Sequence, residues 1–471
     1  MDMQKHRPLA LCCVAFSLAA CAVSTPPPAV PDVAPSGWNA PLPHNGSLSD
    51  LSQWWQSLGD PLLVQLVDAA QAASPTLASA RSRIEQVRAT RAQAAAALLP
   101  ALDLSGSAAR GLTQPLVPVA TTLSANLQAS WELDLFGANR LARDAAQARF
   151  EGAQAQWHDA RVAVAAEIAN LYFEQRACEK QLAIAQSDAA SRAQTSRLTA
   201  QSTQAGFSAP ATAALARAGA AEANSRATQR RGLCELDIKA MVALTGLSEP
   251  ELRQKLTTAP SDLAPNAALA ITSLPAQALG QRPDLFSAER EVAAASADVG
   301  GAQAQRYPRL GLNGSVGLQS FRGSGGSDDF TTWSIGPLSL SVPLFDGGRR
   351  AAGVQAAQAR YDEAATLYRA RVRQAVREVE EALVNLQSTG ARGDDAARAY
   401  EGYRVSLSAT EARFNGGLAS LVELEEARRS ALVSADALVV LHRERIQAWV
   451  ALYRAAGGGW TRNQMVSTTT P

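Results

Sequence analysis

The sequence contains an internal repeat, with its two copies about 208 residues apart. Six positions of the first half recur in step in the second: Pro75, Leu77, Pro100, Leu102, Leu104 and Gly106 correspond to Pro283, Leu285, Pro308, Leu310, Leu312 and Gly314. The match continues, with a small change of register, through Leu135-Phe136-Gly137 and Leu344-Phe345-Asp346-Gly347. Each copy contains helical segments, two alternating segments and then a very long alanine-rich helical segment. We therefore expect one duplicated structural unit.

Composition favours long packed helices over a bulky globular core. Hydrophobic residues make up 47% of the 471 residues, but aromatic residues make up only 5%. Small side chains let helices pack closely along their lengths, as in coiled coils. The formal net charge is +1, which gives no reason to expect nucleic-acid binding.

The N-terminus has the pattern of an export signal. Lys5 and Arg7 precede an apolar run from Leu9 to Leu18, which predicts a signal peptide over residues 1–20. The following Leu18-Ala19-Ala20-Cys21 resembles the lipobox of bacterial lipoproteins, so we expect covalent acyl chains on Cys21, with chance placement of the cysteine as the alternative. The residue after this cysteine is Ala22 and not aspartate, which in bacterial lipoproteins favours transfer to the outer membrane. Seven prolines between Ala22 and Pro43 predict an extended tether.

The alternating segments predict two strands in each copy. In the first copy the apolar positions are Leu123, Ala125, Leu127, Ala129, Trp131, Leu133 and Leu135, and the polar positions are Ser124, Asn126, Gln128, Ser130, Glu132 and Asp134. In the second copy Leu310, Leu312, Val316 and Leu318 alternate with Asn313, Ser315 and Gln319. The fourth strand changes phase at Gly336-Pro337, which predicts a bulge. This pattern is typical of a membrane barrel with a polar lumen; half-buried strands of a soluble sheet are the alternative.

A very long helix is predicted after each strand pair, from about Ala138 to Thr203 and from about Arg349 to Thr410. Each would be roughly 95 Å long. Both end at glycine-containing turns, Gly206-Phe207-Ser208 and Asn415-Gly416-Gly417, and return as helices that end near Leu244 and Ala456. Charged residues are spread along these segments, so we expect the hairpins to project into water.

Two cysteines of the mature chain fall on the first hairpin. Cys178 and Cys234 lie 30 residues before and 26 residues after Ser208, so antiparallel packing would bring them nearly level. A disulfide between the two helices would persist in an oxidising compartment. Two separately buried cysteines are the alternative.

These features divide the chain as follows. Residues 1–20 are the signal peptide, and residues 21–60 are a lipidated tether and the start of an equatorial region. Residues 61–260 form the first repeat, with strands at about 102–135 and a helical hairpin at about 138–245. Residues 261–456 form the second repeat, with strands at about 310–345 and a hairpin at about 349–456. Residues 457–471 are a tail.

Four strands cannot close a membrane barrel, so several chains must share one. The sequence resembles the outer-membrane efflux lipoproteins of Gram-negative bacteria. The resemblance is carried by the lipobox, Trp54-Trp55 with Asp60-Pro61, Gln281-Arg282-Pro283-Asp284-Leu285, Tyr307-Pro308, Pro343-Leu344-Phe345-Asp346-Gly347-Gly348 and Gly457-Gly458-Gly459-Trp460. It implies a homotrimer in which a 12-stranded membrane β-barrel continues into a long α-helical barrel, and partners in a periplasmic adaptor protein and an inner-membrane pump, commonly of the resistance-nodulation-division class.

The resemblance also implies roles for the hairpin turns. Val422, Glu426 and Arg429 fall at i, i+4 and i+7 on one helix face, and they match the leucine, aspartate and arginine that form the closed periplasmic gate in related channels. Valine and glutamate are departures from that pattern, and solvated surface charges are the alternative. The docking tips for the adaptor correspond to Gly206, Phe207, Ser208, Arg413, Gly416, Gly417 and Leu418. Ordinary glycine turns are the alternative there.

No enzymatic motif is found. His44, His158 and His442 have no metalloprotease spacing, and neither a phosphate-binding loop nor a dense Cys/His cluster is present. We therefore expect no catalytic residues, no metal site and no cofactor other than the lipid. The sequence favours an export channel of the outer membrane, gated at its periplasmic tip; a structural envelope lipoprotein without transport is the alternative. It does not identify the exported substrate.

Overall fold

A computed structural model of the chain describes residues 23–31, 34–42, 54–111, 119–259, 279–323 and 326–462. It has two compact units. The first comprises residues up to 31 together with 82–155 and 286–370, and the second comprises 32–81, 156–285 and the chain from residue 371 onward. Each unit therefore takes segments from both sequence repeats. The predicted signal peptide and Cys21 lie outside the described residues.

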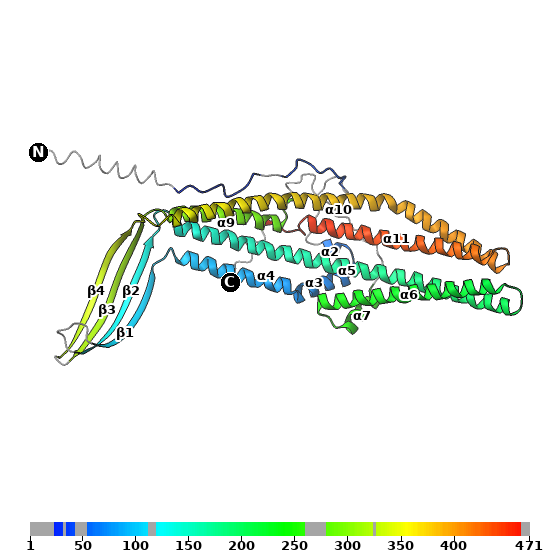
Figure 1. Ribbon diagram of the computed structural model, residues 1–471, viewed down its shortest axis with the longest axis horizontal. Helices are drawn as coiled ribbons and strands as arrows, with labels where there is room; N and C mark the ends of the chain where they lie inside the picture. Colours follow the sequence, from blue (N-terminus) through cyan, green and yellow to red (C-terminus); the bar gives the residue numbers. More distant parts are fainter. Residues whose placement is uncertain are drawn as a thin grey trace. The chain divides into compact units, whose positions relative to one another are not determined.

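The first unit contains an antiparallel sheet in the order β1-β2-β3-β4 (Figure 1). Its strands are β1 (Ala101–Gly111), β2 (Ala120–Leu133), β3 (Arg309–Gly323) and β4 (Gly326–Ser341). They fall close to the two ranges predicted from the alternation. The predicted bulge is also present, because Leu312 pairs with Leu338 whereas Gly314 pairs with Ile335, which leaves one extra residue in β4 at Gly336-Pro337.

The sheet keeps apolar and polar residues on opposite faces across all four strands. Leu104 pairs with Leu127, which pairs with Val316, which in turn pairs with Trp333. Side chains of this face are exposed, and Ile335 is the extreme at 88%. The other face carries hydroxyl pairs, such as Ser315 and Ser334 with their Oγ atoms 2.9 Å apart. The expected alternation therefore extends across all four strands, except near the β3–β4 turn, where Ser320 and Asp329 fall on the apolar face. The apolar face is not buried on a core of the described residues.

Helices of the first unit pack through alanine. α4 (Pro75–Ala96) and α9 (Pro283–Ala304) are both 22 residues long and begin at equivalent prolines of the repeat. A small buried cluster joins α9 to α5 (Ala138–Gln204) and consists of Ala145, Ala148, Ala294 and Ala297. Small side chains permit this close approach, as the composition predicted.

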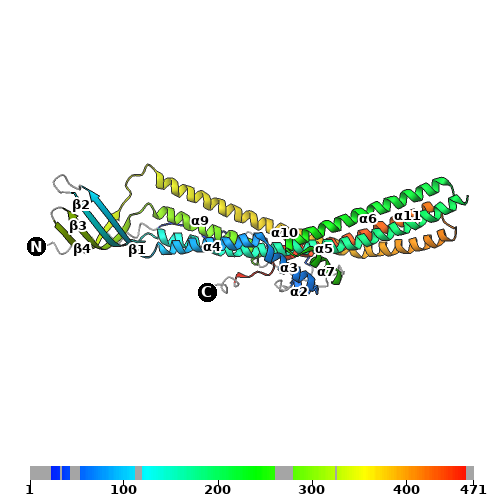
Figure 2. The ribbon, with the colours of Figure 1, turned by 90° about the horizontal axis from the view of Figure 1, so that it is seen from below.

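The second unit is built on two helical hairpins, α5 with α6 (Pro210–Thr245) and α10 (Arg349–Asn415) with α11 (Leu421–Ala455) (Figures 1 and 2). α5 enters this unit at residue 156 and α10 at residue 371. α5 and α10 are each 67 residues long. Their predicted starts agree with the structure, while α10 continues five residues beyond the predicted end at Thr410. Within the described residues, no helix is both long enough and apolar enough to cross a bilayer.

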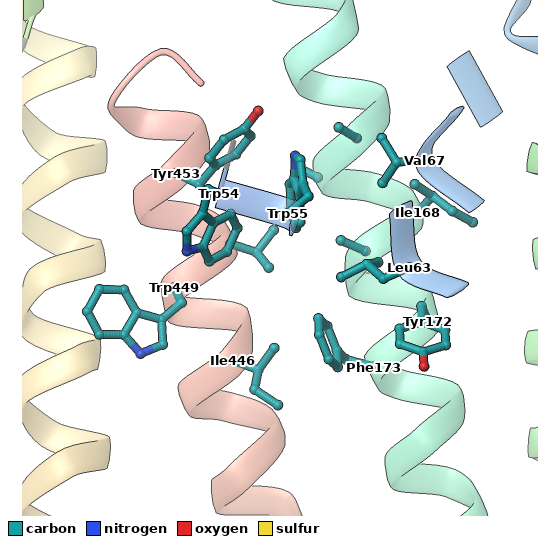
Figure 3. Packing of buried hydrophobic residues seen from close by; sticks show 14 of the residues in the cluster. Trp54, Trp55, Leu63, Val67, Ile168, Tyr172, Phe173, Ile446, Trp449 and Tyr453 are labelled. Atoms are coloured by element: carbon teal, nitrogen blue, oxygen red, sulfur yellow. The ribbon is translucent and has the colours of Figure 1, made fainter. Parts of the chain in front are cut away.

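The main core of the second unit lies where short helices pack on the hairpins. α2 (Trp54–Ser57) and α3 (Pro61–Ala73) contribute Trp54, Trp55, Leu63 and other residues to it. Figure 3 shows this cluster between α5 and α11. Trp54 stacks on Tyr453 of α11 with ring centroids 5.1 Å apart. The Trp54-Trp55 pair is thus a packing element.

The start of α3 is capped from within this core. Asp60 accepts hydrogen bonds from the backbone N–H groups of Leu62 and Leu63, at 3.0 and 3.2 Å, and Pro61 occupies the first helical position. The other carboxylate oxygen accepts a hydrogen bond from the hydroxyl of Tyr172 at 2.5 Å. α7 (Glu249–Thr258) was not predicted. The positions of the second repeat that correspond to α3 fall largely within residues 260–278, outside the described residues.

Candidate functional site at the hairpin turns

The two hairpin turns have the same hydrogen-bond pattern. At the first, Phe207 N–H donates to Ser202 C=O and Gly206 N–H donates to Thr203 C=O, at 2.9 and 3.1 Å. At the second, Leu418 N–H donates to Arg413 C=O and Gly417 N–H donates to Phe414 C=O, at 2.7 and 3.0 Å. Each is a Schellman motif that ends a long helix.

The left-handed residue of this motif is glycine in both turns. Gly206 has φ of 82° and Gly417 has φ of 74°. These backbone angles are costly for a residue with a Cβ atom. Of the predicted tip glycines, Gly416 instead continues the helical pattern, since its N–H donates to Ala412 C=O at 3.1 Å.

An exposed apolar side chain follows the left-handed glycine in each turn. Phe207 is 87% exposed and Leu418 is 75% exposed. In a Schellman motif this position usually packs back on its own helix. Both side chains point to solvent here, so each hairpin presents a large apolar group at its end.

The second turn is fixed further by polar contacts. The Arg413 guanidinium donates to Leu418 C=O at 3.1 Å and lies 3.7 Å from the Glu423 carboxylate. Ser420 and Glu423 form a capping box at the start of α11. The same hydrogen bonds to Ser420 lower the pKa of Glu423. α11 therefore begins at a defined residue immediately before the predicted gate positions.

The predicted gate residues form an exposed stripe on α11. Val422 is 65% exposed, and Glu426 and Arg429 form an ion pair with each other on the same side. The stripe continues to Val433, which is also exposed. Leu421 and Leu424 point the other way and pack against Ala216 of α6. The structure thus brings the three predicted gate residues together on a face that packs on no other part of the described chain.

A buried group of charges was not predicted, although one member, Glu425, lies directly before the predicted gate residue Glu426 in the sequence. Arg192 of α5 is paired with Asp188 at 3.0 Å and also with Glu425 of α11. Asp188 in turn accepts from Arg226 of α6 at 3.0 Å. The side chains of Arg192 and Asp188 are only 9% and 8% exposed. Gly219 faces Arg192 and Glu425, and the position of its absent Cβ is only 3.3 Å from the Arg192 guanidinium.

A second buried arginine extends the group to all four hairpin helices. Arg428 of α11 donates to Thr195 of α5 at 2.8 Å and to Glu411 of α10 at 3.4 Å. It also lies 3.2 Å from Glu425. The two hairpins are therefore joined by ion pairs and hydrogen bonds near their turns. The spacing of Asp188 and Arg192 indicates an ion pair within one helix, but pairs on ordinary helix surfaces have the same spacing. The spacing therefore did not indicate that this pair is buried.

Cys178 and Cys234 are joined by a disulfide, with their Cα atoms 5.6 Å apart. The bond links α5 to α6 across 56 residues of chain. It fixes the register of the first hairpin on the side away from the turn. As for metal sites, no cluster of three or more His, Cys, Asp or Glu side chains suited to an ion occurs in the described ranges.

Comparison with known proteins identifies the family. The outer membrane efflux protein family model matches residues 66–247 and 274–458. The chain is 31% identical to outer membrane protein OprJ of Pseudomonas aeruginosa, over 95% of each chain. It is 30% identical to the pyoverdine export outer membrane protein OpmQ of Pseudomonas putida, over 98% of each.

Solved structures agree with this assignment. The outer-membrane channel OprN is 29% identical, with a TM-score of 0.79 over 93% of this chain and all of the other. The CmeC outer membrane channel of Campylobacter jejuni has the same fold, with a TM-score of 0.83 at 23% identity.

These matches confirm the expected fold class, efflux role and outer-membrane location, and they favour transport over the structural lipoprotein alternative. The protein belongs to the outer membrane efflux protein family.

Proposed function

We propose that three copies of this chain form one gated export duct that works with a periplasmic adaptor and an inner-membrane pump of the resistance-nodulation-division class. Its sheet supports this arrangement, because four strands with an exposed apolar face cannot stand alone in a bilayer. Three sheets together would give twelve strands and remove every open edge. The pump supplies the energy, and the duct itself carries out no chemical reaction.

The gate of this duct is assigned to Val422, Glu426 and Arg429. The observation that carries the proposal is the exposed stripe on α11, which lies opposite a buried face. Rings of charged side chains around an axis can constrict a pore, and in a trimer each of these residues would occur three times. The ion pair between Glu426 and Arg429 holds both side chains at the same level of the helix.

The adaptor docks on the two turns. Phe207 and Leu418 give each hairpin one exposed apolar anchor, and exposed apolar groups on a polar surface mark protein interaction sites. Gly206 and Gly417 keep the backbone compact, so that a partner can approach closely. Ser208 and Arg413 complete the polar rim of the same surface.

The lipid on Cys21 is the only covalent group in this proposal, and no metal or cofactor takes part. Acyl chains would hold the N-terminal segment at the outer membrane.

The docking surface is tested by accumulation of the dye ethidium in the native host. Phe207→Ser together with Leu418→Ser should raise accumulation to the level of a deletion strain, while the purified variant keeps the single-channel conductance of the wild type. The matched control is Leu236→Ser, which changes an exposed leucine of α6 away from the turns. Wild-type efflux by the double variant, or equal loss in the control, would contradict docking at the turns.

A further inference from the structure

The N-terminal segment expected to be a tether is held against the first unit by side chains of two helices. Ser24 N–H donates to the Gln303 side chain at 3.1 Å, and the Ser296 hydroxyl donates to Pro26 C=O at 2.6 Å. Gln303 and Ser296 both belong to α9. The Tyr361 hydroxyl of α10 donates to Pro27 C=O at 3.0 Å. Figure 1 shows this dark blue segment beside α10. Residues 23–31 are extended, as predicted, but they are bound to the fold.

Proline suits this mode of binding. All three contacts use backbone groups of the segment, and Pro26, Pro27 and Pro28 have no N–H group that would need a partner. Proline also restricts the free segment to extended conformations, so less conformational entropy is lost when it binds. The run of prolines therefore favours a bound segment as well as a free spacer.

Gly300 provides the space for the segment. A Cβ atom at this position would lie 2.5 Å from the Thr25 methyl carbon and 2.9 Å from a Leu141 methyl carbon. Both distances are far inside normal contact distance, although the backbone there is helical and does not itself require glycine. The neighbouring Gly301 differs, because its Cβ would come no closer than 4.0 Å to Ala138 C=O.

The continuation of the segment is held in the second unit. Both oxygens of the Glu380 carboxylate accept backbone hydrogen bonds, from Asn39 at 2.6 Å and from Ala40 at 2.8 Å. Ala40 is buried, and Trp38 and Leu42 pack against the main core. A charged acceptor that binds two consecutive N–H groups is a strong and directional contact.

We propose that Ser296, Gly300, Gln303 and Tyr361 form a docking site for residues 23–31, which we call the strap, and that docking fixes where the acyl anchor meets the protein. Two residues separate Cys21 from Ser24, so the chain can place the lipid-bearing residue no farther than about 10 Å from the Gln303 contact. Gln303 is at the end of α9, directly before β3 begins at Arg309. The anchor is thereby held at the membrane end of the first unit. This placement rests on the proposed lipidation, whereas docking of the strap does not.

Docking is tested by elastase cleavage of the purified full-length protein. Elastase cuts after small aliphatic residues, and the Ala29-Val30 bond lies in the strap. The triple variant Ser296→Ala, Gln303→Met, Tyr361→Phe should be cleaved there on the order of tenfold faster than wild type, because cleavage follows the undocked population. Gln355→Met, an exposed change on α10, is the matched control and should leave the rate unchanged.

A second pair of variants tests the same site through shape. Gly300→Ala should also speed cleavage of the strap, and Gly301→Ala should not, although both make the same chemical change in the same helix. Wild-type cleavage rates in both the triple variant and Gly300→Ala would overturn the docking site. Equal acceleration by Gly300→Ala and Gly301→Ala would overturn it as well.

Placement of the lipid is measured with a photoreactive palmitate that carries a diazirine and is fed to the cells. In the wild type its cross-links should concentrate on the last residues of α9 and the first of β3, and in the triple variant they should spread. A chain without any label would refute the lipidation and leave the elastase result standing. Labelled chains with the same cross-links in both proteins would overturn placement by the strap.

Discussion

Arg192 of α5 and Glu425 of α11 form an ion pair that joins the two helical hairpins. Arg192 is also bonded to Asp188 of its own helix, and both side chains of that pair are buried. Asp188 also accepts from Arg226, and Glu425 also lies beside Arg428, so the Arg192 guanidinium is one part of a network of buried charges. Removing Arg192 from this group takes one of its two cations from each carboxylate in a region of low dielectric.

Arg192→Met should therefore destabilise the protein by about 3 kcal/mol. The measurement is chemical unfolding of the purified protein in detergent. Arg398→Met is the matched control, since its ion pair with Asp395 is 77% exposed on both sides and should contribute less than about 1 kcal/mol. Equal losses in the two variants would show that the buried group does not support the hairpins.

The two faces of the sheet should respond differently to lysine. Ile335→Lys places a charge on the apolar face, which costs about 2–4 kcal/mol at mid-bilayer depth, and should reduce the amount of protein recovered in the outer membrane. Ser334→Lys changes the adjacent residue on the polar face, beside Ser315, and should not. Recovery is measured by fractionation of the membranes. Equal recovery of both variants would contradict the assignment of the faces.

The disulfide between Cys178 and Cys234 should stabilise the folded chain. Closing a loop of this length restricts the unfolded chain and contributes about 2–4 kcal/mol. We expect reductant to lower the unfolding midpoint of the wild type and to leave Cys178→Ser with Cys234→Ser unaffected. The same midpoint in both proteins, with and without reductant, would indicate that no bond forms.

His158 should make the second unit sensitive to acid. Burial, with a smaller contribution from the charge of Arg161, lowers the pKa of His158 to about 4 from its ordinary value of 6.5. The unfolded state therefore binds more protons between these values, and stability falls as the pH is lowered from 6.5 towards 4. His158→Gln should lose less thermal stability than the wild type between pH 7 and pH 5. An identical loss would contradict a buried neutral imidazole.

The sequence predicted the elements whose boundaries are marked by local signals. α3 runs from Pro61 to Ala73, because Asp60 and Pro61 start it and Ser74-Pro75 ends it. The strands follow from strict alternation. The end of α10 was placed five residues early, since Glu411 to Asn415 carry no helix-breaking residue and the helix continues to the glycines.

Contacts between segments that are distant in the sequence could not be predicted from local signals. Asp188 and Arg192 have the spacing of any solvated pair, and only packing against α11 buries them. The strap has the composition of a free linker, and its binding depends on Ser296 and Tyr361, which lie far along the chain. For the gate, the spacing of Val422, Glu426 and Arg429 predicted that the three side chains share one face of a helix. The structure shows that this face is exposed.

The exposed stripe of Val422, Glu426 and Arg429 on α11 should close the export channel. This closure is tested by single-channel conductance of the purified protein in planar bilayers. Glu426→Ala with Arg429→Ala should convert small, flickering currents into large, steady ones. Glu401→Ala with Arg404→Ala removes another exposed ion pair of the same spacing from α10 and should leave the currents small. Small currents in the gate variant, or large currents in both variants, would contradict the gate, and no current from any of these proteins would contradict the channel itself.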